Sequence, residues 1–150
     1  MRLSEYLRRE FIVADLAAGD KPGVLAELVA PVARAFPEVD KALAQRVLMD
    51  REALGSTGIG DGVAIPHGKM ELLQEIVIVV GRSEAGLDFE ALDHKPCHIF
   101  FLVLAPERVA GMHLRILAQI SRLLSSEAFR EAFLAADTRE RLWDVLQSHA

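Results

Sequence analysis

The sequence predicts an α/β protein: a three-layer α/β/α domain in which helices flank a mixed β-sheet. Two short apolar runs rich in β-branched residues, Ile76–Val80 and Ile99–Ala105, lie in the middle of the chain. Neither run alternates with polar residues, which is typical of strands buried on both faces. Apolar stripes at helical spacing precede and follow the two runs. These stripes supply the helices that a sheet buried on both faces requires.

The elements before the two runs begin with a predicted strand at Phe11–Val13. A helix is then predicted to begin near Lys21 or Pro22, because apolar residues recur there at helical spacing: Leu25, Leu28, Val29, Val32 and Phe36. Pro31 lacks a backbone donor and is expected to bend this helix. A second helix is predicted to follow Pro37.

The second helix has a polar start and a glycine stop. Asp40 is the predicted N-cap, because its carboxylate can accept from the first free amides, and Gly55 is the predicted end. The residues expected to face the core are Leu43, Val47 and Leu54.

Three helices are predicted after the second apolar run. Their apolar stripes are His113, Ile116, Leu117, Ile120 and Leu124, then Phe129 and Phe133, then Leu142, Val145 and Leu146. Asp137 with Glu140 resembles a capping box at the start of the last helix.

The composition is that of one globular domain, spanning residues 1–150. Hydrophobic residues make up 51% and charged residues 26% of the chain. A net charge of −5, with no block of Lys and Arg, argues against nucleic acid as a partner. The first residues lack the apolar core of a signal peptide, and no apolar run is long enough to insert into a membrane. Cys97 is the single cysteine of the chain and cannot form an internal disulfide. These three observations together predict a soluble cytoplasmic protein.

The stretch GSTGIGDGVAIPHGK, residues 55–69, contains glycines suited to binding an anion. Glycine permits positive φ and lets backbone N–H groups approach a ligand closely. We predict that Gly58 and Gly68, with the hydroxyl groups of Ser56 and Thr57, bind phosphate. The glycine spacing fits neither the dinucleotide fingerprint nor the nucleotide-triphosphate loop. A glycine-rich turn without a ligand is the alternative.

His67 is the candidate nucleophile of this stretch. Pro66 restricts the backbone before it and Gly68 leaves space after it, which predicts an aimed, accessible imidazole. The reference pKa of histidine, about 6.5, leaves a neutral ring nitrogen available at cytoplasmic pH. When such a nitrogen carries the phosphoryl group covalently, the transfer proceeds in two steps, one from the donor to the histidine and one from the histidine to the acceptor.

The segment REALGSTGIGDGVAIPHGK resembles the enzyme IIA domains of the bacterial phosphoenolpyruvate-dependent phosphotransferase system, of the fructose and mannitol type (EIIA type-2 domains), including the nitrogen-regulatory branch. GMHLRILAQISRLL supports this resemblance, which extends in element order over nearly the whole chain. It implies that His67 is phosphorylated by a small histidine phosphocarrier protein, and that Arg51 and His113 lie close to it as catalytic partners. Asp61 stands where Asn is expected in many members. We expect its carboxylate to point to solvent, because near a phosphate it would be repulsive.

Taken without the resemblance, both partners have simpler interpretations. Arg51, near the end of its helix, could satisfy terminal carbonyls and complement the helix dipole. The resemblance makes it the counter-charge of the phosphoryl group, for which its forked donors are suited. An isolated histidine on an apolar stripe, such as His113, is often a core residue. Because a helix N-terminus also suits phosphate, we interpret His113 as a neighbour that orients His67 or holds the phosphate.

Other polar residues do not predict a second site. His94 and His98 are four residues apart, as in a helical metal pair, but Pro96 and the following strand break that geometry. We therefore expect no metal and no cofactor. Cys97 is expected to be a small core residue, and Lys69 either assists the phosphate or is solvated.

The preferred functional hypothesis is a phosphocarrier that acts mainly as a regulator, in signalling of the nitrogen or potassium type, through protein targets. One alternative is a IIA component that passes phosphate to a fructose- or mannitol-type IIB domain for sugar uptake. An alternative of another class is a regulatory module that binds an anion or a partner without covalent chemistry. The chain contains no membrane segment and no IIB-like domain, which favours a free-standing regulator.

Overall fold

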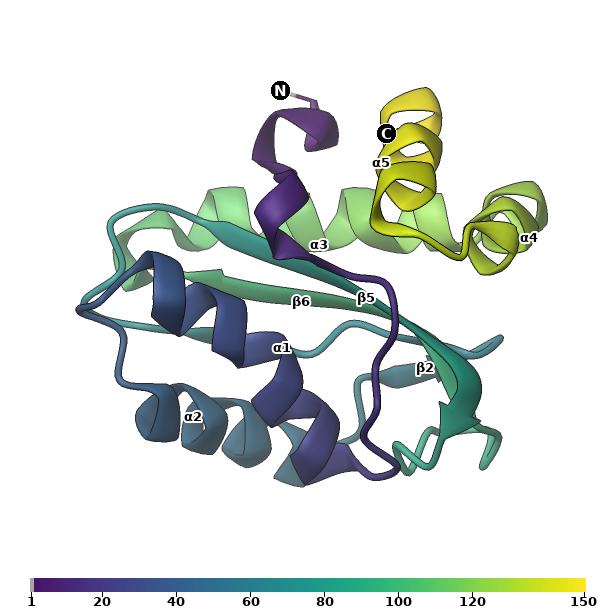
Figure 1. Cartoon of the computed structure of the whole chain (residues 1–150). Coiled ribbons are helices and arrows are strands. Elements are labelled where there is room, and N and C mark those ends of the chain that lie inside the picture. The colour runs from purple at the N-terminus through teal and green to yellow at the C-terminus, as the bar shows by residue number, and fades with distance from the viewer. Residues whose placement is uncertain (1) are drawn as a thin grey trace.

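The computed structural model describes residues 2–150, and it has the three layers that the sequence predicts (Figure 1). A six-stranded mixed sheet lies between α1 (Lys21–Ala35) and α2 (Lys41–Ala53) on one face and α3 (Ala110–Leu124), α4 (Glu127–Ala135) and α5 (Arg139–His149) on the other. Both ends of the described chain lie on the side that α3, α4 and α5 cover (Figure 1).

The sheet is built around two long antiparallel strands. The strands are β1 (Ile12–Val13), β2 (Gly58–Gly60), β3 (Val63–Ala64), β4 (His67–Lys69), β5 (Val77–Leu87) and β6 (Cys97–Ala105). Their order is β1-β5-β6-β3-β2, and β4 also pairs with β6. β3 and β4 follow one another along β6, both parallel to it, so that His67 lies opposite Val103. The chain leaves β6 through η3 (Glu107–Val109) and enters α3, which brings the start of α3 towards β4.

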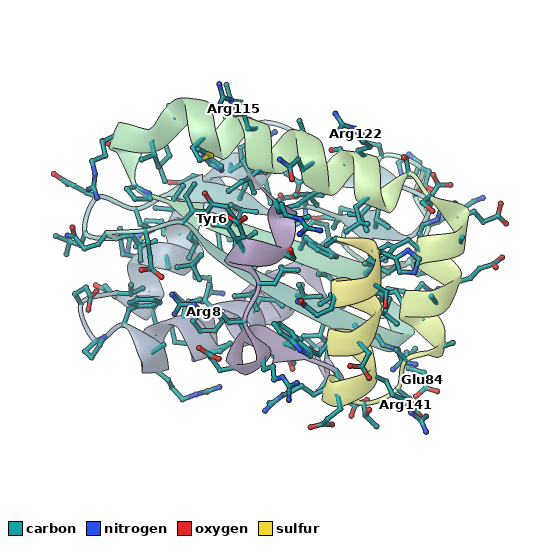
Figure 2. All side chains as sticks on the ribbon, turned by 90° about the horizontal axis from the view of Figure 1, so that it is seen from above. Tyr6, Arg8, Glu84, Arg115, Arg122 and Arg141 are labelled. Carbon is teal, nitrogen blue, oxygen red and sulfur yellow. The ribbon has the colours of Figure 1, made fainter. Side chains whose placement is uncertain are left out.

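Alternate residues of the central strands enter two separate cores. Val77 and Val79 of β5 pack in the core beneath α1 and α2, whereas Ile78 and Val80 pack in the core beneath α3, α4 and α5. This arrangement confirms that the two apolar runs are strands buried on both faces. Seen from above, α3, α5 and the N-terminal segment lie over the second core, and Arg115 projects from α3 towards solvent (Figure 2).

The N-terminal strand is shorter than predicted. Only Ile12–Val13 is extended, and it pairs parallel to β5. Phe11 instead ends the 3-10 helix η2 (Arg9–Phe11), which follows η1 (Leu3–Tyr6).

The helix ends on the first face follow the sequence prediction closely. Asp40 accepts hydrogen bonds from two amides at the start of α2, as predicted, and Asp20 caps α1 by accepting from the Gly23 amide at 2.9 Å. α1 begins at Lys21 and continues past Pro31 to Ala35.

The predicted buried face of α2 was wrong at Leu43 and Leu54. Ala44, Leu48 and Glu52 are the buried residues of this helix. Leu43 and Leu54, which were predicted to face the core, are 42% and 83% exposed, whereas Val47 is partly buried and packs against the core as predicted. The buried stripe contains a carboxylate, and its burial depends on a cation supplied by α1. Hydrophobic periodicity alone does not reveal such a pairing.

The predicted start of α5 was wrong by one residue. Thr138 is the N-cap, and its hydroxyl oxygen accepts from the Arg141 amide at 3.1 Å. Asp137 instead forms an exposed ion pair with the Arg141 guanidinium at 2.7 Å. Asp137 and Thr138 both have side chains that can cap a helix, so the sequence pattern did not show which of the two is the N-cap.

Candidate functional site

The glycine-rich stretch contains a β-hairpin, which the sequence analysis did not predict. β2 and β3 pair antiparallel, and Asp61 and Gly62 form the turn between them with φ values of 56° and 74°. Positive φ at both positions matches the twist of a two-residue hairpin. Asp61 is exposed, as expected.

His67 opens β4 directly after this hairpin and Pro66. Its side chain is partly buried, and Nδ1 lies 2.8 Å from the carbonyl oxygen of Ile65. Because a carbonyl can only accept, we assign the proton to Nδ1, which leaves the Nε2 lone pair free. Burial lowers the pKa of His67 from its ordinary value of 6.5, and the charge of Arg51 lowers it further, against the opposing effects of the Ile65 bond and Glu52. The ring is therefore neutral at neutral pH.

His113 approaches His67 from the first turns of α3. The two ring centroids are 5.8 Å apart and the ring planes are nearly perpendicular, at 80°. Burial lowers the pKa of His113, and the neighbouring imidazole of His67 and the charge of Lys69 lower it further. The side chain is 5% exposed, and its Nε2 has no hydrogen-bond partner within residues 2–150. A buried polar atom without a partner is costly, so this nitrogen marks a position where a ligand could supply the missing contact.

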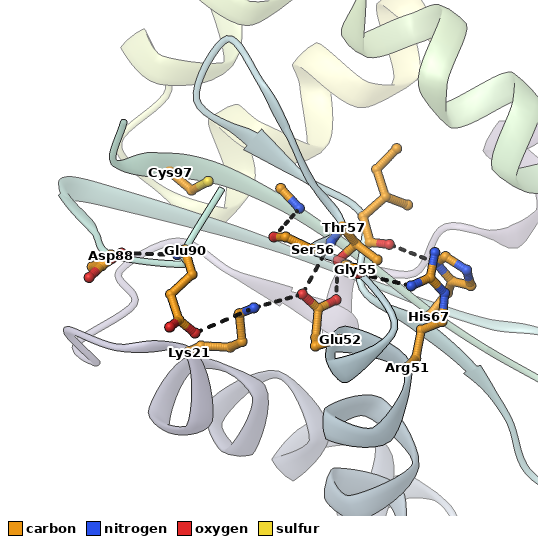
Figure 3. Close-up of polar contacts among 12 residues, drawn as sticks. Lys21, Arg51, Glu52, Gly55, Ser56, Thr57, His67, Asp88, Glu90 and Cys97 are labelled. Atoms are coloured by element: carbon orange, nitrogen blue, oxygen red, sulfur yellow. Dashed lines mark hydrogen bonds and ion pairs between the residues drawn. The ribbon is translucent and has the colours of Figure 1, made fainter. Parts of the chain in front are cut away.

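Arg51 lies in the last turn of α2, beside His67 (Figure 3). Its Nη1 donates a hydrogen bond to the carbonyl oxygen of Gly55 at 2.9 Å. This is the helix-end role that the residue pattern alone favours. The guanidinium nevertheless lines the same hollows as His67, so its charge is also available to a group bound there.

Two surface hollows meet at His67 and Arg51. The smaller, about 160 Å³, is also lined by Ser56, Thr57, Ile59, Ile65, Leu117 and Ser121. The larger, about 400 Å³, is also lined by Val47, Asp50, Leu54, Gly68, Lys69 and His113. Three wider hollows of about 510 to 570 Å³ lie elsewhere, but neither His67 nor His113 lines them.

The two hydroxyl groups predicted to bind phosphate have different surroundings. Thr57 is buried, and both its amide and its hydroxyl donate to the carboxylate of Glu52. Its hydroxyl is therefore already engaged, which corrects the expectation of a free donor. Ser56 accepts at its side-chain oxygen from the Gly58 amide at 3.0 Å, which leaves the Ser56 O–H as a donor.

Close packing explains why the two predicted phosphate-binding positions are glycines. A Cβ at Gly58 would lie 2.8 Å from the Cβ of Ala91, and one at Gly68 would lie 2.6 Å from Cγ1 of Val47. The Gly58 amide is occupied by Ser56, which corrects the expectation that it is free for phosphate. Gly68 packs against α2 and lines the larger hollow beside His67.

A buried ion pair that was not expected from the sequence lies beside the site. The Nζ of Lys21 lies 3.0 Å from the Glu52 carboxylate, and these side chains are 7% and 2% exposed (Figure 3). The signal was present as a stripe at i, i+4 and i+8, in which Glu52 follows Ala44 and Leu48. A charged residue continuing a buried stripe predicts a buried partner.

The remaining candidates do not join the site. Nδ1 of His98 contacts the Ser83 carbonyl oxygen at 2.9 Å, and Cys97 is buried in the core. Burial raises the pKa of the Cys97 thiol to about 11, so it is a poor nucleophile. Within residues 2–150, no three His, Cys, Asp or Glu side chains are grouped so as to hold a metal ion. None of the helices in that part of the chain has the length and apolar character needed to cross a bilayer.

Comparison with known proteins identifies the family. Residues 5–149 match the family described as phosphoenolpyruvate-dependent sugar phosphotransferase system, EIIA 2. The chain belongs to this EIIA family. A nitrogen regulatory protein of Bradyrhizobium diazoefficiens is 36% identical over 146 residues, which cover 97% of this chain and 95% of that protein. The fructose-specific EIIABC component of Bacillus subtilis is 33% identical over 149 residues, or 99% of this chain, but the chain spans only 24% of its length.

A solved EIIA structure supports the same assignment. The nitrogen regulatory protein IIA-Ntr of Neisseria meningitidis superimposes with a TM-score of 0.88 and 31% identity, covering 96% of this chain and 98% of that one. The α/β fold with its mixed sheet is therefore that of the EIIA family. Members of this family are phosphotransfer components, which agrees with a site built around a neutral imidazole.

Proposed function

We propose that this protein is a phosphocarrier that accepts a phosphoryl group on His67 from a histidine phosphocarrier protein and acts mainly as a regulator. One observation carries the proposal. The imidazole of His67 is held through Nδ1 by the Ile65 carbonyl, which leaves Nε2 free, and the ring lines its hollows together with the guanidinium of Arg51 and with His113, whose buried Nε2 has no partner. This arrangement fixes the orientation of the ring and leaves one nitrogen lone pair available in hollows that Arg51 and His113 also line.

The transfer is a displacement at phosphorus. The Nε2 lone pair of His67 forms a bond to the phosphorus of the donor's phosphohistidine while the donor's N–P bond breaks, and that bond's electron pair returns to the donor's ring nitrogen. No proton has to move, because Nδ1 of His67 keeps its proton throughout. The phosphorylated ring becomes cationic, and the Ile65 carbonyl stabilises it by accepting the Nδ1–H bond. Onward transfer repeats the displacement with His67 as the leaving group.

Three side chains can stabilise the charge on the equatorial oxygens during this displacement. Arg51 supplies a forked cation, and the Ser56 hydroxyl supplies a neutral donor at the rim of the smaller hollow. His113 donates from Nε2 when its proton resides there, which gives that buried nitrogen the partner it lacks. Gly68 leaves the approach beside the ring unobstructed.

The surface around His67 suits transient protein partners. Leu54 and Ile59 line the two hollows and are 83% and 49% exposed. Apolar side chains around a reactive group favour docking, and small contact areas permit rapid exchange of partners. Phosphorylation adds up to two negative charges at the centre of this surface, so partners should distinguish the two forms.

The regulatory role is supported by three relatives of 31–36% identity, each matched over 95% or more of its own length, that are named nitrogen regulatory proteins. The alternative within the same family is transfer to a IIB domain for sugar uptake. The fructose-specific relatives favour it. An alternative of another class is a binding module without covalent chemistry, which the buried His113 nitrogen would also suit.

The phosphocarrier proposal is tested by incubation with phosphoenolpyruvate, enzyme I and the phosphocarrier protein, followed by intact-protein mass spectrometry. We expect the gain of one acid-labile phosphoryl group, absent in His67→Ala. His98→Ala is a matched control, because the ring of His98 is also partly buried and also bonded through Nδ1 to a carbonyl. If no phosphoryl group is gained in the presence of competent donors, the phosphocarrier proposal fails and the non-covalent binding module remains.

The downstream role is tested with the phosphorylated protein. Transfer to a fructose- or mannitol-type IIB domain would favour sugar uptake, and the absence of transfer to any IIB domain would favour signalling. Regulatory partners are expected to bind one phosphorylation state more tightly in pull-down experiments. Equal binding of both states by every partner would contradict the regulatory role.

A further inference from the structure

A buried polar cluster lies beside the His67 site, and no step of the proposed transfer uses it (Figure 3). The Glu52 carboxylate accepts from the Lys21 ammonium at 3.0 Å, from the Thr57 amide at 3.1 Å and from the Thr57 hydroxyl. A buried ion pair is weak support for stability, because desolvating two charges offsets much of their attraction. The presence of this cluster beside the site therefore requires another explanation.

We propose that Glu52 is a positioning residue for phosphoryl transfer at His67, and that Lys21 holds Glu52 in place. The inference rests on the proposed function and deepens it. Glu52 does not touch the reacting atoms. It acts through the turn at residues 55–57 and through Arg51.

A chain of hydrogen bonds connects Glu52 to Arg51 through the turn at residues 55–57, and both residues lie in the same turn of α2. Glu52 binds both donors of Thr57, which fixes the turn immediately after the helix. The Gly55 carbonyl in that turn accepts from the Arg51 guanidinium at 2.9 Å. Arg51 and Glu52 are neighbours in sequence, so the turn and the helix constrain each other. The orientation of the guanidinium beside His67 follows from this closed path.

Lys21 is itself fixed from several sides. Its Nζ lies 3.6 Å from the exposed carboxylate of Glu90 and 4.9 Å from the ring centroid of Phe89. The same segment packs against the start of β2, where the Gly58 backbone leaves no space for a Cβ beside Ala91. The cation on α1 therefore links α2, the turn and the segment at residues 88–91. A shift of any of these elements would move the turn that holds Arg51.

Glu52 also contributes an electrostatic effect that a structural role alone would not produce. Its negative charge favours the protonated form of His67 and opposes the lowering of the His67 pKa by burial. The charged or titratable groups that face His67 or line its hollows are Asp50, Arg51 and Glu52 on α2, Lys69 on β4 and His113 on α3. Replacing Glu52 by a neutral residue of the same shape changes one of these charges and leaves the others unchanged.

The test compares Glu52→Gln with the wild type in two measurements. Phosphorylation by phosphoramidate, a small donor that needs no docking, is expected to slow by about tenfold or more, because displacing a catalytic group by about 1 Å can cost a hundredfold. Titration of His67 by NMR is expected to show a lower pKa in the variant, since a nearby negative charge is lost. Arg82→Lys is the matched control. Arg82 is a buried cation outside the site that donates to the Leu134 carbonyl, and its replacement should change stability without changing either readout.

A second variant keeps the test decisive if Glu52→Gln does not fold. Thr57→Val removes one hydrogen bond to Glu52 without changing any charge, so we expect slower phosphorylation with an unchanged His67 titration. A wild-type phosphorylation rate in whichever of the two variants folds would overturn the positioning role. Failure of the wild type itself to take up a phosphoryl group would instead overturn the proposed function, so the two failures are distinguishable.

Discussion

Replacing Lys21 by Met should destabilise this protein strongly. Lys21 and Glu52 lie 3.0 Å apart with side chains that are 7% and 2% exposed, so the substitution leaves a buried carboxylate without its counter-charge. Removing one partner of such a buried pair lowers the free energy of unfolding by about 3–5 kcal/mol. The two hydrogen bonds from Thr57 remain, so we expect a loss at the lower end, about 3 kcal/mol.

Urea denaturation followed by circular dichroism measures this loss. With a slope of about 1–3 kcal/mol per molar urea, the midpoint should fall by at least about 1 M. Glu90→Gln is the matched control, because Glu90 pairs with the same Lys21 at 3.6 Å but is 74% exposed, and such a pair contributes at most about 1 kcal/mol. Lys21→Met combined with Glu52→Gln should recover most of the loss. A Lys21→Met variant as stable as Glu90→Gln would refute the reasoning that the pair is buried and mutually dependent.

Three further predictions follow from the site and the packing around it. Gly58→Ala should lower the free energy of unfolding, measured in urea, by about 1–3 kcal/mol, because the new Cβ would lie 2.8 Å from the Cβ of Ala91. In the control Gly111→Ala no atom lies within 4 Å of the new Cβ, so this change should be neutral or stabilising. Arg51→Gln should slow phosphorylation by about a hundredfold, as measured by time-resolved mass spectrometry. Because the variant also loses the hydrogen bond to the Gly55 carbonyl, its free energy of unfolding should change by about 1 kcal/mol. An effect on stability alone would contradict the role assigned to Arg51. Burial lowers the pKa of both site histidines, so the unfolded chain binds protons more readily than the folded protein. The free energy of unfolding should therefore fall as pH drops below about 6.5 and through the lowered pKa values, and a variant with Gln at both positions should show a weaker dependence.

The layers of the fold could be predicted from the sequence because their signals are local. The apolar runs that became β5 and β6 lack polar alternation, and Asp40 precedes its helix as an N-cap should. The hairpin in the glycine-rich stretch was missed, because β2 and β3 are too short to show a period. Their pairing depends on β6, which is distant in sequence.

The buried face of α2 shows where local patterns fail. Leu54 is apolar and exposed, while Glu52 is charged and buried. Burial of Glu52 is favourable only because Lys21, on another helix, and Thr57, beyond the helix end, supply its partners. The spacing of Glu52 from Ala44 and Leu48 indicates that it is buried, but no period in the sequence indicates which residue is its partner.

The candidate site could be predicted in part. Pro66 and the following glycine indicated a constrained imidazole at His67, and the family resemblance implied Arg51 and His113 near it. The structure brings the two rings to 5.8 Å and leaves Arg51 lining the same hollows. The partial burial of His67 and its bond to the Ile65 carbonyl depend on the register of β4 beside β6, which the sequence pattern does not specify.

The most direct test of the account is to find which ring nitrogen carries the phosphoryl group. Nitrogen-15 and phosphorus-31 NMR of the phosphorylated protein, labelled at its imidazole nitrogens, reports the N–P bond and the remaining N–H of each histidine. We expect phosphorus on Nε2 of His67, with Nδ1 still protonated beside the Ile65 carbonyl. Phosphorus on Nδ1 of His67, or on His113, would contradict the account.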